Sequence, residues 1–285
     1  GKSVSAMSII GLVRTPPGRI VGGVALLEDE DLFAASDERI RQLRGSAVSH
    51  VFQDPLSTLH PLFTVGDQLI EAIRAHQPLS HKQARDRAEE LLKTVRIPNA
   101  GSRLDSYPHE MSGGMRQRVC IAMALANEAD VIIADEPTTA LDITVQAQVL
   151  SLLDKLRKER DTGILFITHD FGVVSAICDR VAVMYAGKIV ETGTTEEILS
   201  APKHPYTAKL IDCVPVLGEP ERRLDAIEGR PPVVNRLPDG CAFAPRCPRV
   251  QDDCKSGEIG MRHFGERRAA RCLHPLEEER EAEHV

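Results

Sequence analysis

The chain has 285 residues, with 35 Lys and Arg against 42 Asp and Glu, so its formal net charge is −7. This length fits one large domain or two unequal ones. Hydrophobic residues make up 42% of the chain and charged residues 27%, which excludes wholesale disorder. The longest apolar run, residues 119–126, is far shorter than the ~20 residues of a membrane span. The sequence has no signal-peptide pattern, and its net charge disfavours a nucleic-acid binder.

The first two thirds of the chain alternate short β-branched runs with helical patterns, which predicts a parallel sheet with crossover helices. Apolar residues recur on one helical face over residues 80–95 and 144–160. Ser80 and Gln83 have the spacing of a capping box at the start of the first of these helices. Short apolar runs predict three strands, over residues 47–52, 131–134 and 164–168.

Each predicted strand ends in a polar side chain. Gln53 follows the first strand, Asp135 and Glu136 follow the second, and His169 follows the third. The carboxyl ends of parallel strands lie along one edge of a sheet, where ligands bind. An ordinary polar loop explains one such ending, but three endings with catalytic residue types favour a shared site.

Two motifs indicate phosphate chemistry. Gly1-Lys2-Ser3 matches the end of a Walker A loop, in which Lys contacts phosphate oxygens and Ser binds Mg²⁺, and a helix is expected over residues 4–13. Three residues alone are a weak signal. Asp135 and Glu136 after a buried strand meet the needs of a Walker B segment, with Asp135 near Mg²⁺ and Glu136 near the attacking water. The alternative for this pair is a solvated acidic turn.

A second helix start could also bind phosphate. Ser112 is a good N-cap, Gly113 and Gly114 allow close approach of the backbone, and the helix behind them begins with free N–H groups. An ordinary glycine loop is the alternative, but it leaves the serine and the long helix unexplained. Two phosphate-binding helix starts in one chain suggest two half-sites.

The composition changes near residue 200. Prolines crowd into residues 202–248, and helical periodicity fades. We therefore predict a domain boundary near residue 200, a small loop-rich module after it, and a fraying charged tail over residues 277–285.

Four of the seven cysteines lie in the part of this module beyond residue 240. Intervening stretches of five, six and seventeen residues separate Cys241, Cys247, Cys254 and Cys272. Disulfides are disfavoured in a reducing compartment, whereas a metal could staple a small module with little core. The short knuckles of structural zinc sites are missing, and thiolates can equally hold an iron–sulfur cluster. The residues alone leave zinc, iron–sulfur and free thiols open; Cys120 and Cys178 are expected in the core.

Taken together, the motifs resemble the ATP-binding subunit of ABC transporters. The matching segments stand in the family's order: Gln53 of the Q-loop, residues 112–117 of the signature, residues 135–138 of Walker B, residues Ala140-Leu141-Asp142 of the D-loop, and His169 of the switch. The resemblance covers residue 1 to about residue 193. Met111 departs from it, because the signature more often begins with Leu, a near-isosteric exchange.

The resemblance implies a fold and a site. The fold is an α/β P-loop NTPase domain over residues 1–200, with a parallel sheet core, an antiparallel β edge and a helical subdomain over about residues 55–118, followed by a small irregular Cys-rich domain over residues 201–285. Glu136 and His169 would be catalytic, and Mg²⁺ would be held by Ser3, Gln53 and Asp135. ATP would lie in a head-to-tail dimer between Gly1, Lys2, Ser3 and Gln53 of one subunit and a signature from the other, with Asp142 joining the two sites. The corresponding signature residues are Ser112, Gly113 and Gly114.

The family's glycine-rich part of Walker A and the strand before it do not precede Gly1 in this sequence. The first Met is Met7, so we expect the natural N-terminus to lie upstream. We also expect the 285-residue chain by itself to bind ATP poorly.

The later part of the chain refines the resemblance. Residues 204–207 and 241–248 resemble the C-terminal extension of dipeptide and oligopeptide importer ATPases. The resemblance implies a four-iron, four-sulfur cluster on Cys241, Cys247, Cys254 and Cys272, with zinc as the alternative. It also implies ATP-driven import of peptides at the cytoplasmic face of the membrane, as a peripheral subunit. The implied partners are a second ATPase, two permeases and, indirectly, a solute-binding protein, and a heterodimer is favoured over a homodimer.

Other functions remain in competition. Within transport, the solute could instead be nickel or a glycoside. A non-transport ABC ATPase acting on DNA or ribosomes is disfavoured by the net charge and by the lack of a long coiled-coil insertion. An inactive binding module is disfavoured because Glu136 and His169 are both present.

Overall fold

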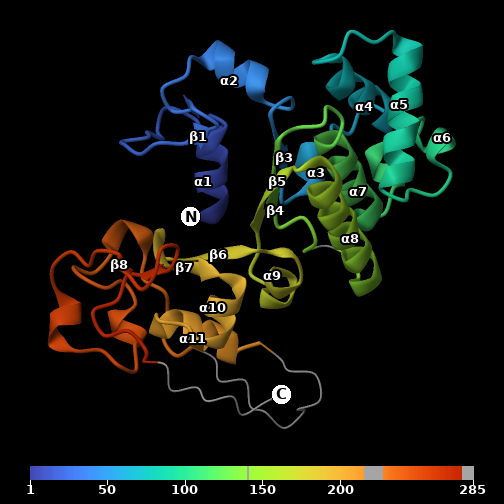
Figure 1. Ribbon diagram of the computed structural model, residues 1–285. Coiled ribbons are helices and arrows are strands. Elements are labelled where there is room, and N and C mark those ends of the chain that lie inside the picture. Colours follow the sequence, from blue (N-terminus) through green and yellow to red (C-terminus); the bar gives the residue numbers. More distant parts are fainter. Residues whose placement is uncertain (140, 215–226, 278–285) are drawn as a thin grey trace. The chain divides into compact units, whose positions relative to one another are not determined.

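The computed structural model describes residues 1–139, 141–214 and 227–277. Contacts divide the chain into two compact units, residues 3–169 and residues 1–2 with 170–285, and each is described by itself (Figure 1). The division falls at residue 170, thirty residues before the predicted domain boundary. Ala140 of the expected D-loop and residues 278–285 of the expected charged tail lie outside the described residues.

A three-stranded parallel sheet forms the centre of the unit over residues 3–169. Its order is β3 (Val48–Val51), β4 (Val131–Asp135) and β5 (Gly163–Ile167). Val131 pairs with Val48 on one side and with Gly163 on the other. The three predicted strands are therefore confirmed, with ends that differ by at most one residue from those expected.

The two faces of this sheet bury different side chains because successive strand residues point to opposite faces. Val48 and Ile133 pack against α1 (Lys2–Ile9), whereas Val51 and Ile132 belong to the larger core under the helices. The structure ends α1 at Ile9 rather than residue 13, and Gly11 just after it has a positive φ of 62°, which glycine adopts readily. A small hairpin and a helix follow: β1 (Leu26–Leu27), β2 (Glu30–Asp31) and α2 (Asp37–Leu43).

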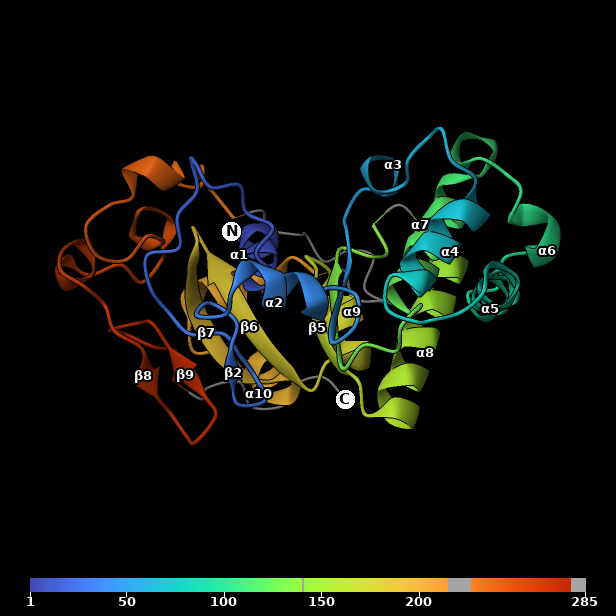
Figure 2. The ribbon, with the colours of Figure 1, turned by 90° about the horizontal axis from the view of Figure 1, so that it is seen from above.

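Helices form the other part of this unit (Figure 2). The capping box expected at Ser80 is confirmed: Ser80 Oγ accepts from the N–H of Gln83, and the Gln83 side chain accepts from the N–H of Ser80. Leu69, Leu92 and Ile121 are among the fully buried side chains of their common core. The helices are α3 (Pro55–Thr58), α4 (Val65–Arg74), α5 (His81–Thr94), α6 (Ala100–Arg103), the 3₁₀ turn Pro108–Glu110, α7 (Gly113–Ala124) and α8 (Ile143–Arg160).

The second unit contains an antiparallel sheet of order β6-β7-β9-β8. Thr192 of β7 pairs with Ala269 of β9, so a strand from the region after residue 200 joins the sheet that precedes it. This pairing explains why the contacts do not divide the chain near residue 200. The elements are α9 (Phe171–Ile177), β6 (Arg180–Tyr185), β7 (Lys188–Thr194), α10 (Thr195–Ser200), α11 (Pro205–Asp212), β8 (Arg262–His263) and β9 (Ala269–Ala270).

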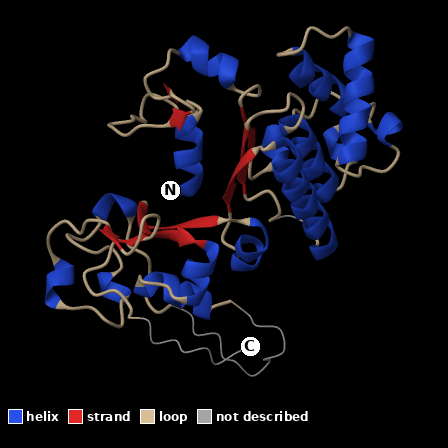
Figure 3. Ribbon diagram, viewed as in Figure 1, coloured by secondary structure: helices blue, strands red, loops and turns tan. Residues whose placement is uncertain are grey.

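Beyond α11, the described residues of the second unit are mostly loops (Figure 3). Three 3₁₀ turns, Val234–Arg236, Ala244–Arg246 and Asp252–Lys255, interrupt them. Phe243 is fully buried and anchors these loops through ring contacts with Tyr185 and Tyr206, at centroid distances of 5.3 Å each. Among the described residues, no helix is both long enough and apolar enough to cross a bilayer.

The cysteines expected in the core differ in their burial. Cys120 on α7 is buried, as expected, whereas Cys178 at the end of α9 is only half-buried. Burial raises the pKa of the Cys120 thiol to about 12. Because the thiolate is the reactive form, Cys120 is chemically inert in the folded protein.

We expect Cys120 to resist alkylation by iodoacetamide at pH 8 in the folded protein and to react fully once the chain is unfolded. Mass spectrometry of labelled peptides measures this, with half-buried Cys178 as the internal comparison. Equal labelling of Cys120 and Cys178 under native conditions would contradict the burial of the α7 thiol.

Candidate functional site

The carboxylate of Glu136 is the point at which three strand ends meet. Gln53, after β3, donates from Nε2 to Glu136 Oε2 at 3.0 Å. His169, after β5, places Nδ1 3.3 Å from Glu136 Oε1. The convergence expected from the strand endings is therefore present in the structure. Each carboxylate oxygen has a different neighbour, so the orientation of the group is constrained from both sides.

The backbone at Glu136 is unusual. Its φ is +48°, in the left-handed region that residues with a Cβ rarely adopt. The N–H of Glu136 donates to Ile167 O at 2.9 Å, which keeps the residue bound to the end of β5. The side chain is 16% exposed. The strained turn thus holds the carboxylate at the sheet edge, partly shielded from water, and such strain is typical of functional positions.

Asp135, the last residue of β4, is 3% exposed. Its Oδ1 is buried and has no hydrogen-bond partner among the described residues. A buried carboxylate oxygen without a partner is costly, and a bound cation would relieve the cost. Mg²⁺ prefers carboxylate and hydroxyl oxygens, so Asp135 fits the metal that the sequence analysis assigned to it.

Two side chains near the site were missed by sequence reasoning. Thr139 Oγ1 donates to Glu136 Oε2 at 3.0 Å, alongside Gln53. His50 on β3 has both ring nitrogens buried without partners among the described residues. Burial lowers the pKa of His50, and the negative charge of Asp135 partly offsets this. The only sequence signal for Thr139 was its position three residues after Glu136, which suits a turn.

The other residues predicted to contact the nucleotide lie at the N-termini of helices. Ser112 caps α7, and its Oγ accepts from the N–H of Met115 at 3.3 Å. A Cβ added at Gly113 would meet nothing within 4 Å, so that backbone is open to close approach. Asp142 caps α8 and accepts from the N–H of Val145 at 2.9 Å. These contacts confirm the predicted N-cap at Ser112, whereas contact of these residues with ATP stays a prediction.

The Walker A fragment is divided between the two units. Gly1 and Lys2 belong to the unit over residues 170–285, and Ser3 belongs to the unit over residues 3–169. Lys2 is the first residue of α1, which forms the helix expected after the motif. Binding of phosphate by Gly1 and Lys2, and of Mg²⁺ by Ser3, stays a prediction.

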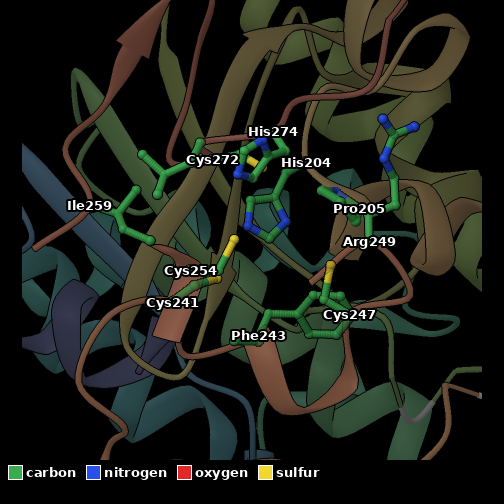
Figure 4. A pocket seen from close by; sticks show the side chains of 12 residues that line it. His204, Pro205, Cys241, Phe243, Cys247, Arg249, Cys254, Ile259, Cys272 and His274 are labelled. Atoms are coloured by element: carbon green, nitrogen blue, oxygen red, sulfur yellow. The ribbon is translucent and has the colours of Figure 1, made fainter. Parts of the chain in front are cut away.

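The four cysteines of the second unit line one cavity, together with His204 and Phe243 (Figure 4). The N–H of Cys241 donates to Cys254 O at 2.9 Å, which joins two of the four segments directly. Burial raises the pKa of Cys241 and Cys247, and it raises that of Cys272 to about 11. A bound metal reverses this, because coordination deprotonates a thiol.

The cysteine sulfurs are spread more widely than a single ion requires. A tetrahedral zinc site with Zn–S bonds of ~2.3 Å places its sulfurs about 3.8 Å apart. Among the described residues, no three of the four cysteines have their sulfurs within 4.8 Å of one another. The set that does meet this limit is Asp253, Cys254 and His274, in which His274 Nε2 lies 2.9 Å from Asp253 Oδ2. That hydrogen bond is the main cause that lowers the pKa of Asp253.

A parallel sheet that presents Asp135, Glu136 and His169 at one edge, with a serine-capped glycine helix start in the same unit, is the architecture of an ATP-binding cassette. The family description "ABC transporter" matches residues 1–139, and the description "Oligopeptide/dipeptide transporter, C-terminal region" matches residues 190–254. The chain belongs to the ABC transporter ATP-binding proteins that carry this C-terminal region.

Individual relatives agree with both matches. The chain is 45% identical to the oligopeptide transport ATP-binding protein AppD of Bacillus subtilis, over 99% of this chain and 86% of that protein. It is 44% identical to the dipeptide transport ATP-binding protein DppD of Haemophilus influenzae, over 98% of this chain and 84% of that protein. A solved structure of the ATP-binding cassette MJ0796, in a dimeric post-hydrolysis state bound to ADP and Pi, aligns with a TM-score of 0.62 at 27% identity, over 68% of this chain and 81% of that one.

Replacing Thr139 with Val removes the hydroxyl that donates to Glu136 while keeping a β-branched side chain of similar size. One hydrogen bond to a charged group is worth about 1.5 kcal/mol, so we expect ATP turnover to fall about tenfold. Steady-state phosphate release measures the effect. Thr139→Ser keeps the hydroxyl and is the control; equal loss in both variants would contradict a role for the hydrogen bond.

Proposed function

We propose that this chain is the ATP-hydrolysing subunit of a membrane importer for dipeptides and oligopeptides. The observation that carries the proposal is the Glu136 carboxylate, held between Gln53 and His169 at the ends of three parallel strands. The match of the C-terminal region to the oligopeptide/dipeptide transporter family supports the class of solute.

Glu136 has the placement expected of the group that orients the attacking water and accepts its proton. Its carboxylate lies next to Asp135, the proposed Mg²⁺ ligand, in a site only partly open to solvent. Phosphoryl transfer depends mainly on positioning and electrostatics, so a fixed carboxylate accounts for much of what the protein must supply. His169 would contact the γ-phosphate, and Gln53 and Ser3 would complete the magnesium site with Asp135. Mg²⁺ supplies neutralisation of the charge on the phosphate oxygens.

The ATP site is completed by a second subunit in a head-to-tail dimer. The open backbone at Gly113 and the helix start behind Ser112 support this, because they form an anion-binding site. The phosphate for this site would come from a nucleotide held by the other subunit. Ser112, Gly113 and Gly114 would contact the nucleotide of the partner, and Asp142 would link the two sites. We favour a heterodimer with a sister ATPase.

The chain acts at the cytoplasmic face of the membrane, as a peripheral subunit of two permeases that receive solute from a binding protein. Gln53 and the helices after it would contact the permeases. Closing of the dimer on ATP and its reopening after hydrolysis would then drive the permeases between inward- and outward-facing states.

We further propose that Cys241, Cys247, Cys254 and Cys272 hold a four-iron, four-sulfur cluster with a structural role. All four line the same cavity, and no three of their sulfurs lie within 4.8 Å of one another. A cluster with several iron atoms binds each thiolate at a different corner, which suits this wider spacing. A bound cluster would cross-link the loop-rich segment around the cysteines and add stability that its small core does not provide.

Glu136→Gln keeps the shape of the side chain and removes its charge and basicity. In the full-length protein we expect ATP turnover to fall by about 100-fold or more, while ATP-dependent closure of the dimer is preserved. Phosphate release and size-exclusion chromatography with ATP measure the two effects. Glu128→Gln makes the same exchange at a surface carboxylate of the same unit and is the control. Unchanged turnover in Glu136→Gln would remove Glu136 from the mechanism.

Cys247→Ser removes one proposed cluster ligand. In protein prepared without oxygen, we expect the brown absorption at about 400 nm to be lost and the melting temperature of the C-terminal region to fall. Cys213→Ser, which changes a half-buried cysteine that does not line the cavity, is the control. A colourless wild-type protein containing stoichiometric zinc would decide for the zinc alternative.

A further inference from the structure

His204 is held at a fixed position beside the cysteine cavity. It is the N-cap of α11, and its backbone N–H donates to Glu191 Oε2 at 2.9 Å. The N–H of Lys203 donates to the other oxygen of the same carboxylate at 2.6 Å. Glu191 is itself fully buried on β7. The segment that carries His204 is therefore clamped to the antiparallel sheet by two adjacent hydrogen bonds.

The ring of His204 has a defined tautomer. Nδ1 accepts a hydrogen bond from the backbone N–H of Tyr206 at 3.0 Å. A nitrogen that accepts carries no proton, so in the neutral ring the proton lies on Nε2. The residue is 1% exposed, and Phe243 packs against the ring at a centroid distance of 6.0 Å. His204 thus presents a single donor, Nε2–H, from a ring that cannot reach solvent.

This donor has no partner within the described part of the chain. Nε2 of His204 is buried and unpaired, and the ring lines the same cavity as Cys241, Cys254 and Cys272 (Figure 4). A buried donor without an acceptor is costly, so something that enters the cavity must accept from it. The polar side chains of the cavity wall besides the cysteines are Arg249, which only donates, and His274, whose Nε2 is already bonded to Asp253, so the thiol sulfurs are the remaining side-chain acceptors. Thiolate or sulfide carries negative charge once a metal is bound, which makes it an acceptor.

We propose that Nε2–H of His204 donates a hydrogen bond to a sulfur of the cluster bound by the four cysteines and thereby raises its reduction potential. The inference rests on the iron–sulfur cluster proposed above. A hydrogen bond to sulfur stabilises the more negative, reduced state more than the oxidised state, and hydrogen bonds to the sulfurs are an established determinant of cluster potential. His204 is a positioning and tuning residue: its ring lines the cavity and its unpaired Nε2 carries the proton, so it donates and does not ligate.

The substitution His204→Asn separates the two roles of the ring. Asn is among the best N-cap residues, so its side-chain oxygen can keep the hydrogen bond from Tyr206, while the donor at the position of Nε2 is lost. We expect the same iron and sulfide content as in the wild type. We expect the midpoint potential, measured by redox titration of the visible absorption in anaerobic protein, to fall by about 59 mV, the equivalent of a tenfold change for a one-electron couple.

His274→Asn is the matched control. His274 also lines the cavity, but its Nε2 already contacts Asp253 at 2.9 Å, so the same substitution removes no unpaired donor. We expect its midpoint potential to stay near that of the wild type. A cluster whose potential is unchanged in His204→Asn, as expected if a water accepts from Nε2, overturns the inference. Equal shifts in both variants overturn it as well.

A second measurement tests the hydrogen bond even if the His204→Asn variant fails to bind the cluster. In wild-type protein labelled with ¹⁵N-histidine and reduced, pulsed EPR should detect a nitrogen coupled to the cluster, and this coupling should persist in His274→Asn. Absence of this coupling from the wild type overturns the hydrogen bond even if the variant cannot be loaded with the cluster.

The outcomes distinguish the two proposals. If the wild-type protein contains no iron and sulfide, the proposed cluster is refuted, and the inference falls with it. If the wild type holds the cluster but the variants leave its midpoint potential unchanged, only the inference is refuted.

Discussion

The hydrogen bonds to the Glu136 carboxylate are the constraint on which the rest of the first unit depends. Gln53 and His169 are 116 residues apart in the chain, yet both contact this one side chain. They can do so because β3 and β5 flank β4 in a parallel sheet, so that all three strands end at the same edge. The left-handed turn at Glu136 is stabilised by the same arrangement, since its N–H bonds to the end of β5.

The second unit uses a buried carboxylate in a comparable way. Glu191 on β7 accepts from two consecutive backbone N–H groups, at Lys203 and His204, and so joins the start of α11 to the sheet. Accepting from backbone donors compensates much of the cost of burying its charge. This contact determines where the His204 ring lies, and the ring in turn forms part of the wall of the cysteine cavity. In both units a fixed acidic group thus positions the side chains that surround it.

Much of the fold could be predicted because it follows from local patterns. The three central strands, the helix with its Ser80–Gln83 capping box and the N-cap at Ser112 lie where periodicity and capping residues place them. Long-range pairing could not be read in the same way. The pairing of β7 with β9 moves the division of the chain to residue 170, and two-residue strands such as β9 have no periodicity that would reveal them.

The sequence by itself indicated Gln53, Asp135, Glu136 and His169 at the strand ends and the Ser112 helix start, because polar side chains after apolar strands and a glycine pair after an N-cap are local signals. Only the tertiary structure decided which groups lie together: Thr139 shares the Glu136 oxygen with Gln53, and His204, whose Nε2 has no partner among the described residues, lines the cavity of the four cysteines. A hydrogen bond requires the donor–acceptor distance to be set to within about a tenth of an ångström and its direction to within a few tens of degrees. Those are set by packing between segments far apart in the chain, and no spacing along the sequence encodes them.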